Sequence, residues 1–528
     1  MIKKFIKLFF IFLIIAIIIF LIYEAMSLKI YIKNEDIIVS ELSKEQKNED
    51  FKYLTTIISE IYPFAELIEN VKGLKNITSL KESFIERAGK TKNNEEFLLL
   101  FIEYLEYLRQ AGHGGILFLN DYNFYTSYSF NIPKDAFLKS NYWLKLASQL
   151  NLYVHNDLNI IYFEGQYILN SPYIKNNQLI EKGSIVKSID NINIDEYVKL
   201  LQNSQPLLYD SNLEKSFASQ LFMVDLNQEN TVWKVEFKKP NGEFQVFTIP
   251  KKQGYKLSNE KIQIQDNLLL KELNSDTAYL KIKSFGYEHI EKDGEKIQNF
   301  FKDSKGKYET LIIDLRGNIG GEIIYWAENL IKPFINEDKT LEVFTAVRKK
   351  FISRMNRHLL YYRLFTSNDL LDRKTNDITN VKKIKIEDLN PKDWNVYKIT
   401  KLFKPKNTYD FNGKIFILVD KDTISAADSY ISAAKELGLG TVMGDNTSGW
   451  GNQYIQPWIF SLPNSGLMFR MDVELAYNAD KKESSIYGTS PDIYLQNSTY
   501  PTSCPEGYDL EDLIKEPWIK RILDNNFK

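Results

Sequence analysis

The most hydrophobic segment of the chain lies at its beginning. Phe5–Tyr23 consists almost wholly of Ile, Leu and Phe, and only Lys7 interrupts it near the start. A helix of roughly 20 apolar residues is long enough to cross a bilayer. Lys3 and Lys4 precede the run, and lysines beside a span favour the cytoplasmic side of the membrane. We therefore predict a single-pass anchor in the cell membrane over residues 1–27, with the bulk of the chain extracytoplasmic.

A cleaved signal peptide and a buried core helix are the alternatives for this segment. The apolar region of a signal peptide normally has about 7–15 residues and ends in small residues. This run is longer, and Tyr23–Ser27 is a poor cleavage site. No cysteine lies directly after the run, which argues against a lipoprotein signal. A core helix rarely opens a chain behind two lysines, so we favour the uncleaved anchor.

The next part of the chain has helical periodicity. Residues 28–50 are polar and mixed, which favours a linker. From Phe51 to Gln110 apolar residues recur at three- and four-residue spacing, a pattern typical of amphipathic helices. The pattern stops at Ala111–Gly115, because neighbouring glycines break helices. We predict a helical domain over residues 51–145.

Short alternating runs of apolar and polar residues then replace the helical pattern. Val232–Phe237 alternates in this way, and the turn residues Pro240–Gly242 connect it to Phe244–Phe247. Two such runs joined by a glycine-containing turn indicate a β-hairpin. Together with a helix near Ile194–Leu201, they predict a small β-rich domain over residues 150–258.

Strands alternate with helices from about residue 275. Three apolar runs have the length and composition of buried strands: Thr277–Ile282, Thr310–Asp314 and Lys414–Asp420. Helical periodicity follows Gly321 and again follows Ser425. This order predicts an α/β layer.

The α/β pattern is interrupted by an insertion and is followed by a C-terminal tail. A polar stretch rich in Lys, Arg and Asn interrupts it at about 335–411. We therefore predict a core over residues 265–500 with an insertion, and a C-terminal tail over residues 501–528. The fold class is α/β, within an α+β multidomain chain.

Composition excludes several classes of function. The 67 Lys and Arg residues nearly balance the 69 Asp and Glu residues, whereas a nucleic-acid-binding protein needs a basic excess. A single cysteine, Cys504, excludes an internal disulfide and a cysteine-rich metal site. No metal-ligand spacing such as H-E-x-x-H is present. We predict no metal, no cofactor and no nucleic acid partner.

Two segments of the core carry candidate chemistry. Ile313–Gly321 is a strand that runs into a glycine-rich turn, and such a turn can present N–H groups to an anion or a developing oxyanion. Its plainer interpretation is a tight turn. Ser425 opens a helix behind a strand. A serine there is usually an N-cap, but the helix dipole also favours an alkoxide at that position.

These segments resemble motifs of one enzyme family. Asp314–Gly321 resembles the D-L-R-G-N-x-G-G motif of the S41 peptidases, the C-terminal-processing or tail-specific proteases. Thr423–Asp428 resembles the S-A-x-E nucleophile motif, with Asp428 in place of the usual Glu. Gly444–Gly449 resembles G-E-x-T-x-G, and Gly488–Ile493 resembles G-x-x-P-D-I/V. The four motifs occur in the order found in the family.

The resemblance covers residues from about 275 to 500 and extends weakly upstream. Glu181–Asn191 is similar to the core of a PDZ domain, which the family often carries ahead of its catalytic core. The resemblance implies a ClpP/crotonase-like α/β catalytic core, a PDZ-like β-rich domain, and an N-terminal helical domain behind the transmembrane helix.

One departure from the family changes the choice of general base. The Ser/Lys branch carries its catalytic lysine in T-x-G-K-G, but here Thr447–Gly451 places Trp450 at that position. Of the four histidines, His113 lies in Ala111–Gly115, which resembles a histidine segment of the Ser/His branch, the tricorn-like and retinoid-binding-protein-like members. The resemblance implies that His113 activates Ser425.

The remaining site residues also follow from the resemblance. The Ser/His branch draws a Glu from before its P-D motif to orient the imidazole, which points to Glu483, with Asp480 as its competitor. The oxyanion donors would be the N–H groups of Ala426 and Gly321, with Gly320 as neighbour.

The sequence thus predicts a membrane-anchored extracytoplasmic serine endopeptidase with a Ser-His-Glu mechanism and an acyl-enzyme. Its partners would be peptide or unfolded protein substrates and, through the N-terminal helix, the membrane. A catalytically inactive peptide- or ligand-binding protein on the same fold is one alternative, because fold does not fix chemistry. A serine esterase is another.

Overall fold

A computed structural model gives the fold of most of the chain. It describes residues 39–117, 133–149, 154–155, 158–175, 178–224, 231–253, 267–303, 306–354, 376–380, 392–406, 408–409, 411–453, 455, 457–495 and 510–525. The predicted anchor over residues 1–27 lies outside these ranges. Within them, no helix has the length and hydrophobicity needed to cross a bilayer.

The N-terminal region is helical. Its helices are α2 (Lys44–Ile61), α3 (Ala65–Asn70), α4 (Lys81–Ala88), α5 (Asn94–Glu106) and α7 (Lys134–Gln149). The first helix begins within the segment predicted to be a linker, because Ser43 and Gln46 form a reciprocal capping box that fixes its start. Phe51, Phe97 and Tyr104 pack their rings together between the helices.

The β-rich region that follows contains a sheet of the strand order β12-β11-β7-β4-β3. The hairpin predicted around Pro240–Gly242 is confirmed as the antiparallel pair of β11 (Val232–Lys238) and β12 (Phe244–Pro250). The other main elements are β3 (Ile160–Phe163), β4 (Gln166–Leu169), β7 (Ile185–Ile189), β8 (Ile192–Asn193) and α8 (Ile194–Leu200). Short strands β2 (Val154–His155), β5 (Tyr173–Lys175), β6 (Gln178–Ile180), β9 (Leu208–Asp210), β10 (Lys215–Phe217) and β13 (Lys252–Gln253) complete it.

The core sheet has the order β14-β15-β16-β20-β21-β25. Its strands are β14 (Leu268–Glu272), β15 (Thr277–Ile282), β16 (Thr310–Asp314), β20 (Lys414–Val419), β21 (Thr441–Gly444) and β25 (Ile493–Tyr494). The strands predicted over 277–282 and 310–314 are confirmed, and all neighbours from β15 to β25 pair in parallel. Parallel strands bring their carboxyl ends to one edge of the sheet, where an α/β fold places its chemistry.

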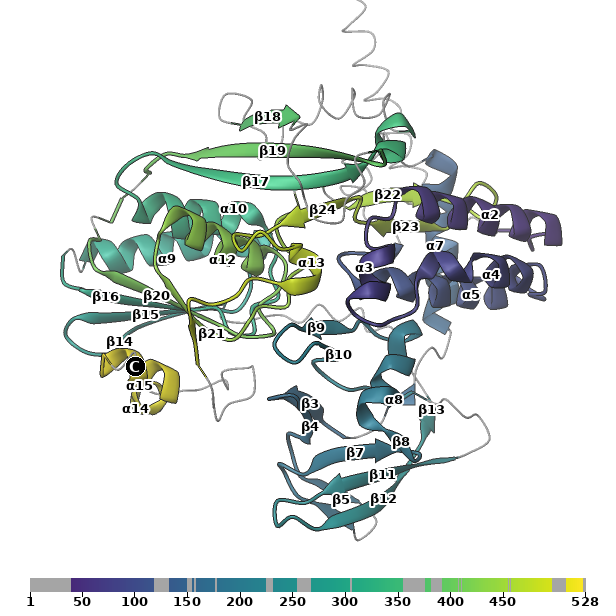
Figure 1. The fold of residues 1–528 in the computed structure, drawn as a ribbon, viewed down its shortest axis with the longest axis horizontal. Helices are drawn as coiled ribbons and strands as arrows, with labels where there is room; N and C mark the ends of the chain where they lie inside the picture. Colours follow the sequence, from purple (N-terminus) through teal and green to yellow (C-terminus); the bar gives the residue numbers. More distant parts are fainter. Residues whose placement is uncertain are drawn as a thin grey trace, which may run out of the picture.

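Helices cover both faces of this sheet (Figure 1). One face packs on α9 (Ile290–Asp303), α10 (Ile323–Trp326) and α12 (Ala426–Leu437), with Ile297, Trp326 and Ile431 in the shared core. The other face packs on α14 (Leu510–Lys515) and α15 (Pro517–Leu523). The predicted C-terminal tail is therefore partly a pair of helices on the core.

The predicted insertion contains a long β-ribbon. Strands β17 (Lys339–Arg348) and β19 (Trp394–Phe403) pair antiparallel, with β18 (Asn376–Asn380) on the outer side of β19. On its inner side β17 pairs with β24 (Glu474–Tyr477). The ribbon lies above α9, α10 and α12 (Figure 1).

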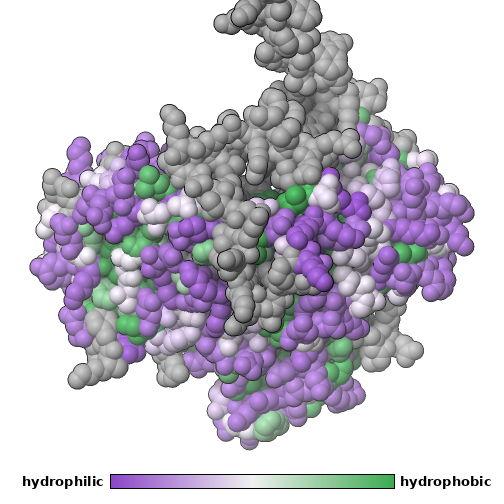
Figure 2. Space-filling model, turned by 45° about the horizontal axis from the view of Figure 1, so that its top comes forward, coloured by the Kyte–Doolittle hydropathy of each residue, from purple (hydrophilic) through white to green (hydrophobic). Residues whose placement is uncertain are grey.

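A small sheet joins the helical region to the core. Its order is β1-β23-β22, from β1 (Gly115–Leu117), β22 (Trp458–Ser461) and β23 (Met468–Met471). Helix α13 (Ser484–Tyr487) follows β24. Figure 2 shows one face of the molecule, on which hydrophilic side chains predominate and hydrophobic ones form small separate groups.

Candidate active site

Ser425 lies between the end of β20 and the start of α12, in a conformation that few residues adopt. Its φ of 60° and ψ of −125° place a non-glycine residue at positive φ, which costs on the order of 1–3 kcal/mol and persists only where the surroundings hold it. Its N–H donates to Gly449 O at 2.7 Å. Its hydroxyl makes no capping hydrogen bond to α12. Ser425 therefore occupies the N-cap position of α12, but its side chain does not cap the helix.

The hydroxyl of Ser425 faces the imidazole of His113. The distance from His113 Nε2 to Ser425 Oγ is 3.0 Å, which is within the range for proton transfer between a base and a nucleophile. The two residues are far apart in sequence, and the helical region and the core each supply one. Sequence analysis paired these two residues, and the structure brings them together.

Asp472 lies on the other side of the imidazole. Its Oδ2 is 3.3 Å from His113 Nδ1 and accepts the His113 backbone N–H at 2.8 Å. The pairing of β1 with β23 explains this placement, because Gly115 pairs with Arg470 in an antiparallel register. His113 precedes Gly115 by two residues and Asp472 follows Arg470 by two residues, so the same register places His113 opposite Asp472.

The approach of Asp472 requires a glycine before the histidine. Gly112 has a φ of 76°, and a Cβ there would lie 2.0 Å from Asp472 Oδ2. The Asp472 side chain is 1% exposed, and its second oxygen, Oδ1, has no hydrogen-bond partner among the residues described. The carboxylate is thus buried with one oxygen committed to His113.

Glu483, the residue predicted to orient His113, does not hold that position. It is the N-cap of α13, where its carboxylate accepts the N–H groups of Ser485 and Ile486 at 3.0 and 2.9 Å. Burial raises its pKa to about 7. The competing candidate, Asp480, pairs with Lys435 at 3.0 Å and accepts Ser490 N–H at 2.8 Å. Both carboxylates therefore stabilise local loops, and Asp472 holds the place assigned to Glu483.

The sequence did not point to Asp472, because the family resemblance places the third catalytic group by its distance in sequence from the P-D motif. Strand pairing between β1 and β23 decides the neighbour of His113, and a single sequence does not give that pairing. The available signal was an acidic residue, Asp472, directly after Leu467–Met471, a run that is apolar except for Arg470. A carboxylate at the end of a buried strand is a candidate for a specific role.

The glycine-rich turn lies against Ser425. We call Leu315–Gly321 the oxyanion turn and Asp420–Ser425 the nucleophile loop. A Cβ on Gly320 would lie 2.8 Å from both Ser425 Cβ and Ala426 N, so only glycine allows this approach. The Gly320 N–H donates to Asn318 Oδ1 at 2.9 Å and is therefore engaged.

Two other N–H groups are free to act as oxyanion donors. Those of Gly321 and Ala426 have no hydrogen-bond partner within the described part of the chain. Gly321 has a φ of 139°, and its Cα packs against the Phe285 backbone, where a Cβ would be 2.4 Å from the carbonyl carbon. Free N–H groups of this kind stabilise a tetrahedral oxyanion. Of the three predicted residues, Gly321 and Ala426 fit the donor role and Gly320 fits the role of spacer.

Trp450 and Asp428 are two departures from the family motifs, and both contact residues around the candidate site. The Trp450 ring contacts His113 edge to face, with centroids 6.1 Å apart. Asp428 is buried in α12 and accepts hydrogen bonds from Thr447 Oγ1 at 2.5 Å and Ser484 Oγ at 2.8 Å. Burial raises the pKa of Asp428. Asp428 thereby fixes the Thr447 segment and α13 to α12, the helix that follows Ser425.

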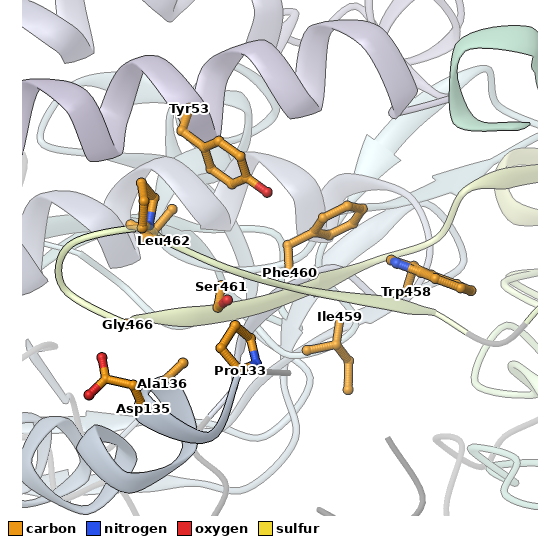
Figure 3. Close-up of a pocket in the computed structure, with 11 residues that line it drawn as sticks. Tyr53, Pro133, Asp135, Ala136, Trp458, Ile459, Phe460, Ser461, Leu462 and Gly466 are labelled. Atoms are coloured by element: carbon orange, nitrogen blue, oxygen red, sulfur yellow. The ribbon is translucent and has the colours of Figure 1, made fainter. Parts of the chain in front are cut away.

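A separate pocket lies at the far end of the β22–β23 hairpin (Figure 3). It has a volume of about 310 Å³ and is lined by Tyr53 of α2, Ala136 of α7 and Ile459 and Ser461 of β22, among others. None of its described lining residues belongs to the Ser425–His113–Asp472 cluster. Within the described ranges, no group of three His, Cys, Asp or Glu side chains could hold a metal ion.

Part of the chain that contains this candidate site matches a known protein family. Residues 276–495 match the model described as peptidase family S41. These residues form an S41 peptidase domain. The S41 domain contains Ser425, Asp472 and the oxyanion turn, whereas His113 lies outside the match. The match assigns this segment to a family of serine peptidases, whose substrates are peptides.

The solved structures of mature CPAF have a similar fold over most of this chain. The structure of mature CPAF complexed with lactacystin is 13% identical, covers 86% of this chain and 94% of that chain, and has a TM-score of 0.51. The crystal structure of mature CPAF is 14% identical, covers 86% and 93%, and has the same TM-score of 0.51. The photosystem II D1 C-terminal processing protease is 13% identical, covers 88% and 96%, and has a TM-score of 0.40.

The matches to mature CPAF show a mixed α/β multidomain fold like that of S41 peptidases, with a helical N-terminal region. No curated protein matches the chain in sequence.

Proposed function

We propose that this chain is a serine endopeptidase that uses Ser425 as nucleophile and His113 as general base. The observation that carries the proposal is the distance of 3.0 Å between His113 Nε2 and Ser425 Oγ. A serine hydroxyl becomes a useful nucleophile only with a base within hydrogen-bond reach. The positive φ of Ser425 supports the proposal, since strained residues concentrate at functional sites.

The reaction follows from the positions of the groups. Ser425 Oγ attacks the peptide carbonyl carbon while its proton passes to His113 Nε2. Asp472 accepts the hydrogen bond from His113 Nδ1, which fixes the tautomer and stabilises the imidazolium. The N–H groups of Gly321 and Ala426 bind the oxyanion. His113 then protonates the leaving amine, and water hydrolyses the ester on Ser425 with His113 again as base.

Substrate turnover separates the peptidase from its alternatives. We expect the extracytoplasmic portion of the chain to digest casein and Ser425→Ala to abolish digestion. Turnover of p-nitrophenyl esters without casein digestion would identify a serine esterase. Cleavage of neither substrate by a folded protein would leave a peptide-binding protein on the S41 fold.

We also propose that the β-rich region is PDZ-like and holds an extended peptide for the S41 domain. Its antiparallel sheet with α8 beside β7 supports this assignment. Such a domain adds the peptide as a strand to its sheet. Deletion of residues 150–258 is expected to raise KM for casein more than KM for a p-nitrophenyl ester, since the ester is too small to reach this domain.

Finally, we propose that Phe5–Tyr23 anchors the chain in the cell membrane with the S41 domain outside the cytoplasm. Its apolar run and its flanking lysines support this placement.

A further inference from the structure

Asp420 occupies the junction between the two segments that form the oxyanion hole. It is the first residue of the nucleophile loop, and its side chain is buried. Its Oδ1 accepts the Gly317 N–H of the oxyanion turn at 2.9 Å. The same oxygen accepts the Asp422 N–H and the Thr423 hydroxyl, each at 3.1 Å. One carboxyl oxygen therefore joins the turn that carries Gly321 to the loop that carries Ser425.

Other hydrogen bonds join the same two segments. The Thr423 hydroxyl also lies 3.0 Å from Leu315 O, and the Ile424 N–H donates to Asn318 O at 3.0 Å. Gly321 and Ala426 must stay at a fixed separation to bind one oxyanion. Because a misplacement of about 1 Å can cost roughly 100-fold in rate, the junction sets the quality of the oxyanion hole.

We propose that Asp420 is a positioning residue for the oxyanion hole and that its neutral, protonated form is the one that supports catalysis. The proposal rests on the proposed Ser425 mechanism. Asp420 touches neither substrate nor the reacting atoms, and it acts through the oxyanion turn.

The second carboxyl oxygen supports the neutral form. Asp420 Oδ2 is buried and has no hydrogen-bond partner among the described residues. An unpaired charge on such an atom costs far more than an unpaired hydroxyl. An ionised Asp420 would also place a negative charge behind the site where the oxyanion develops, which opposes its stabilisation.

The charged groups around Asp420 agree with this assignment. Asp422 on the same loop repels a negative charge, whereas Lys281 of β15 and Arg316 of the oxyanion turn attract one. Both cations are already paired with Asp314, and Arg316 also pairs with Glu516, the N-cap of α15. The neighbouring Lys421 pairs with Asp210 and Asp445. Burial is the main cause that raises the pKa of Asp420, and repulsion by the Asp422 carboxylate is the second. Together they raise it to about 7.

The test compares wild type, Asp420→Asn and Asp420→Ala in p-nitrophenyl ester turnover and in the rate of Ser425 labelling by a fluorophosphonate, from pH 6 to 9. Asn keeps the accepting oxygen but cannot ionise. We expect wild-type kcat to fall by up to about tenfold per pH unit above pH ~7. Asp420→Asn is expected to lose this fall. Asp420→Ala is expected to lower kcat by roughly 10- to 100-fold with little change in KM.

Asp50→Asn is the matched control. Asp50 is also a buried carboxyl whose pKa is raised by burial, and it accepts the N–H groups of Asn464 and Ser465 in the β22–β23 turn. Its substitution should leave the pH profile unchanged.

Two results would overturn the inference while the proposed function stands. In the first, the wild-type protein is labelled, but kcat of Asp420→Asn still falls above pH ~7. In the second, Asp420→Ala keeps the wild-type kcat. A folded wild-type protein that is not labelled at any pH overturns the proposed function, and this inference with it.

Discussion

Asp472 and Glu483 are two buried carboxylates near one histidine, and their different contacts give them different roles. Asp472 Oδ2 lies 3.3 Å from His113 Nδ1, whereas Glu483 caps α13. We expect Asp472→Asn to lower kcat by about 10³- to 10⁴-fold with little change in KM, because the imidazole loses the partner that fixes its tautomer. Glu483→Gln should cost less than about tenfold. Steady-state kinetics of both variants would contradict this assignment if Glu483→Gln were the more damaging change.

The glycine before the histidine gives a second test at the same scale. Gly112 combines a φ of 76° with a Cβ position 2.0 Å from Asp472 Oδ2. We expect Gly112→Ala to abolish turnover and to lower the melting temperature. Gly73→Ala is the matched control, since Gly73 has a φ of 63° but no atom within 4 Å of its Cβ position. That control should cost only about 1–2 kcal/mol of unfolding free energy. Equal effects of the two substitutions would show that the Asp472 contact is unimportant.

Helix α13 shows how a buried cap couples stability to pH. Burial raises the pKa of Glu483 from 4.5 to about 7 in the folded chain. Between these values the folded protein binds more protons than the unfolded one, so this group's contribution to stability is present below pH ~4.5 and is lost as pH rises to about 7. Glu483→Gln should remove a slope of at most about 1.4 kcal/mol per pH unit in this window. Urea unfolding at several pH values measures the slope, and an unchanged slope in the variant would exclude Glu483 as its source.

The elements that sequence predicted best are those whose stability is local. The strands over 277–282 and 310–314 are continuous apolar runs, and the hairpin around Pro240–Gly242 has its turn residues in place. Helix α2 begins earlier than the sequence pattern predicts, because the polar residues of the capping box at Ser43 have the composition of a linker. Ser425 and His113 were predicted because motifs surround them.

The partner of His113 could not be predicted in this way. Asp472 is placed by the pairing of β1 with β23, a contact between segments more than 300 residues apart. Its discovery needed the register of that pair, which depends on how the helical region packs on the core. Trp450 likewise gave no sign in the sequence that its ring would contact His113.

On the scale of the whole molecule, the active site forms only when separate regions dock. The helical region supplies His113, and the S41 domain supplies Ser425 and Asp472. The C-terminal helices support the same site from the opposite face of the sheet, since Glu516 pairs with Arg316 of the oxyanion turn at 2.8 Å. A chain that lacks the helical region should therefore fail to label at Ser425 even if the S41 domain folds.

The anchor is the second prediction at this scale. We expect the full chain to remain in the membrane fraction after alkaline carbonate extraction and a chain beginning at residue 28 to be released, because roughly 20 apolar residues suffice to span the bilayer. Protease added to intact cells or spheroplasts should digest the S41 domain. Protection of that domain in intact spheroplasts would contradict the predicted orientation.

The most direct measurement is the site of fluorophosphonate modification, mapped by mass spectrometry in wild type, Ser425→Ala and His113→Ala. The 3.0 Å contact between His113 Nε2 and Ser425 Oγ predicts a single adduct on Ser425 in the wild type. It predicts no adduct in Ser425→Ala, and labelling in His113→Ala that is slower by about 10³-fold or more. Labelling of Ser425 that proceeds at the wild-type rate without His113, or an adduct on another residue, would contradict the Ser425–His113 mechanism.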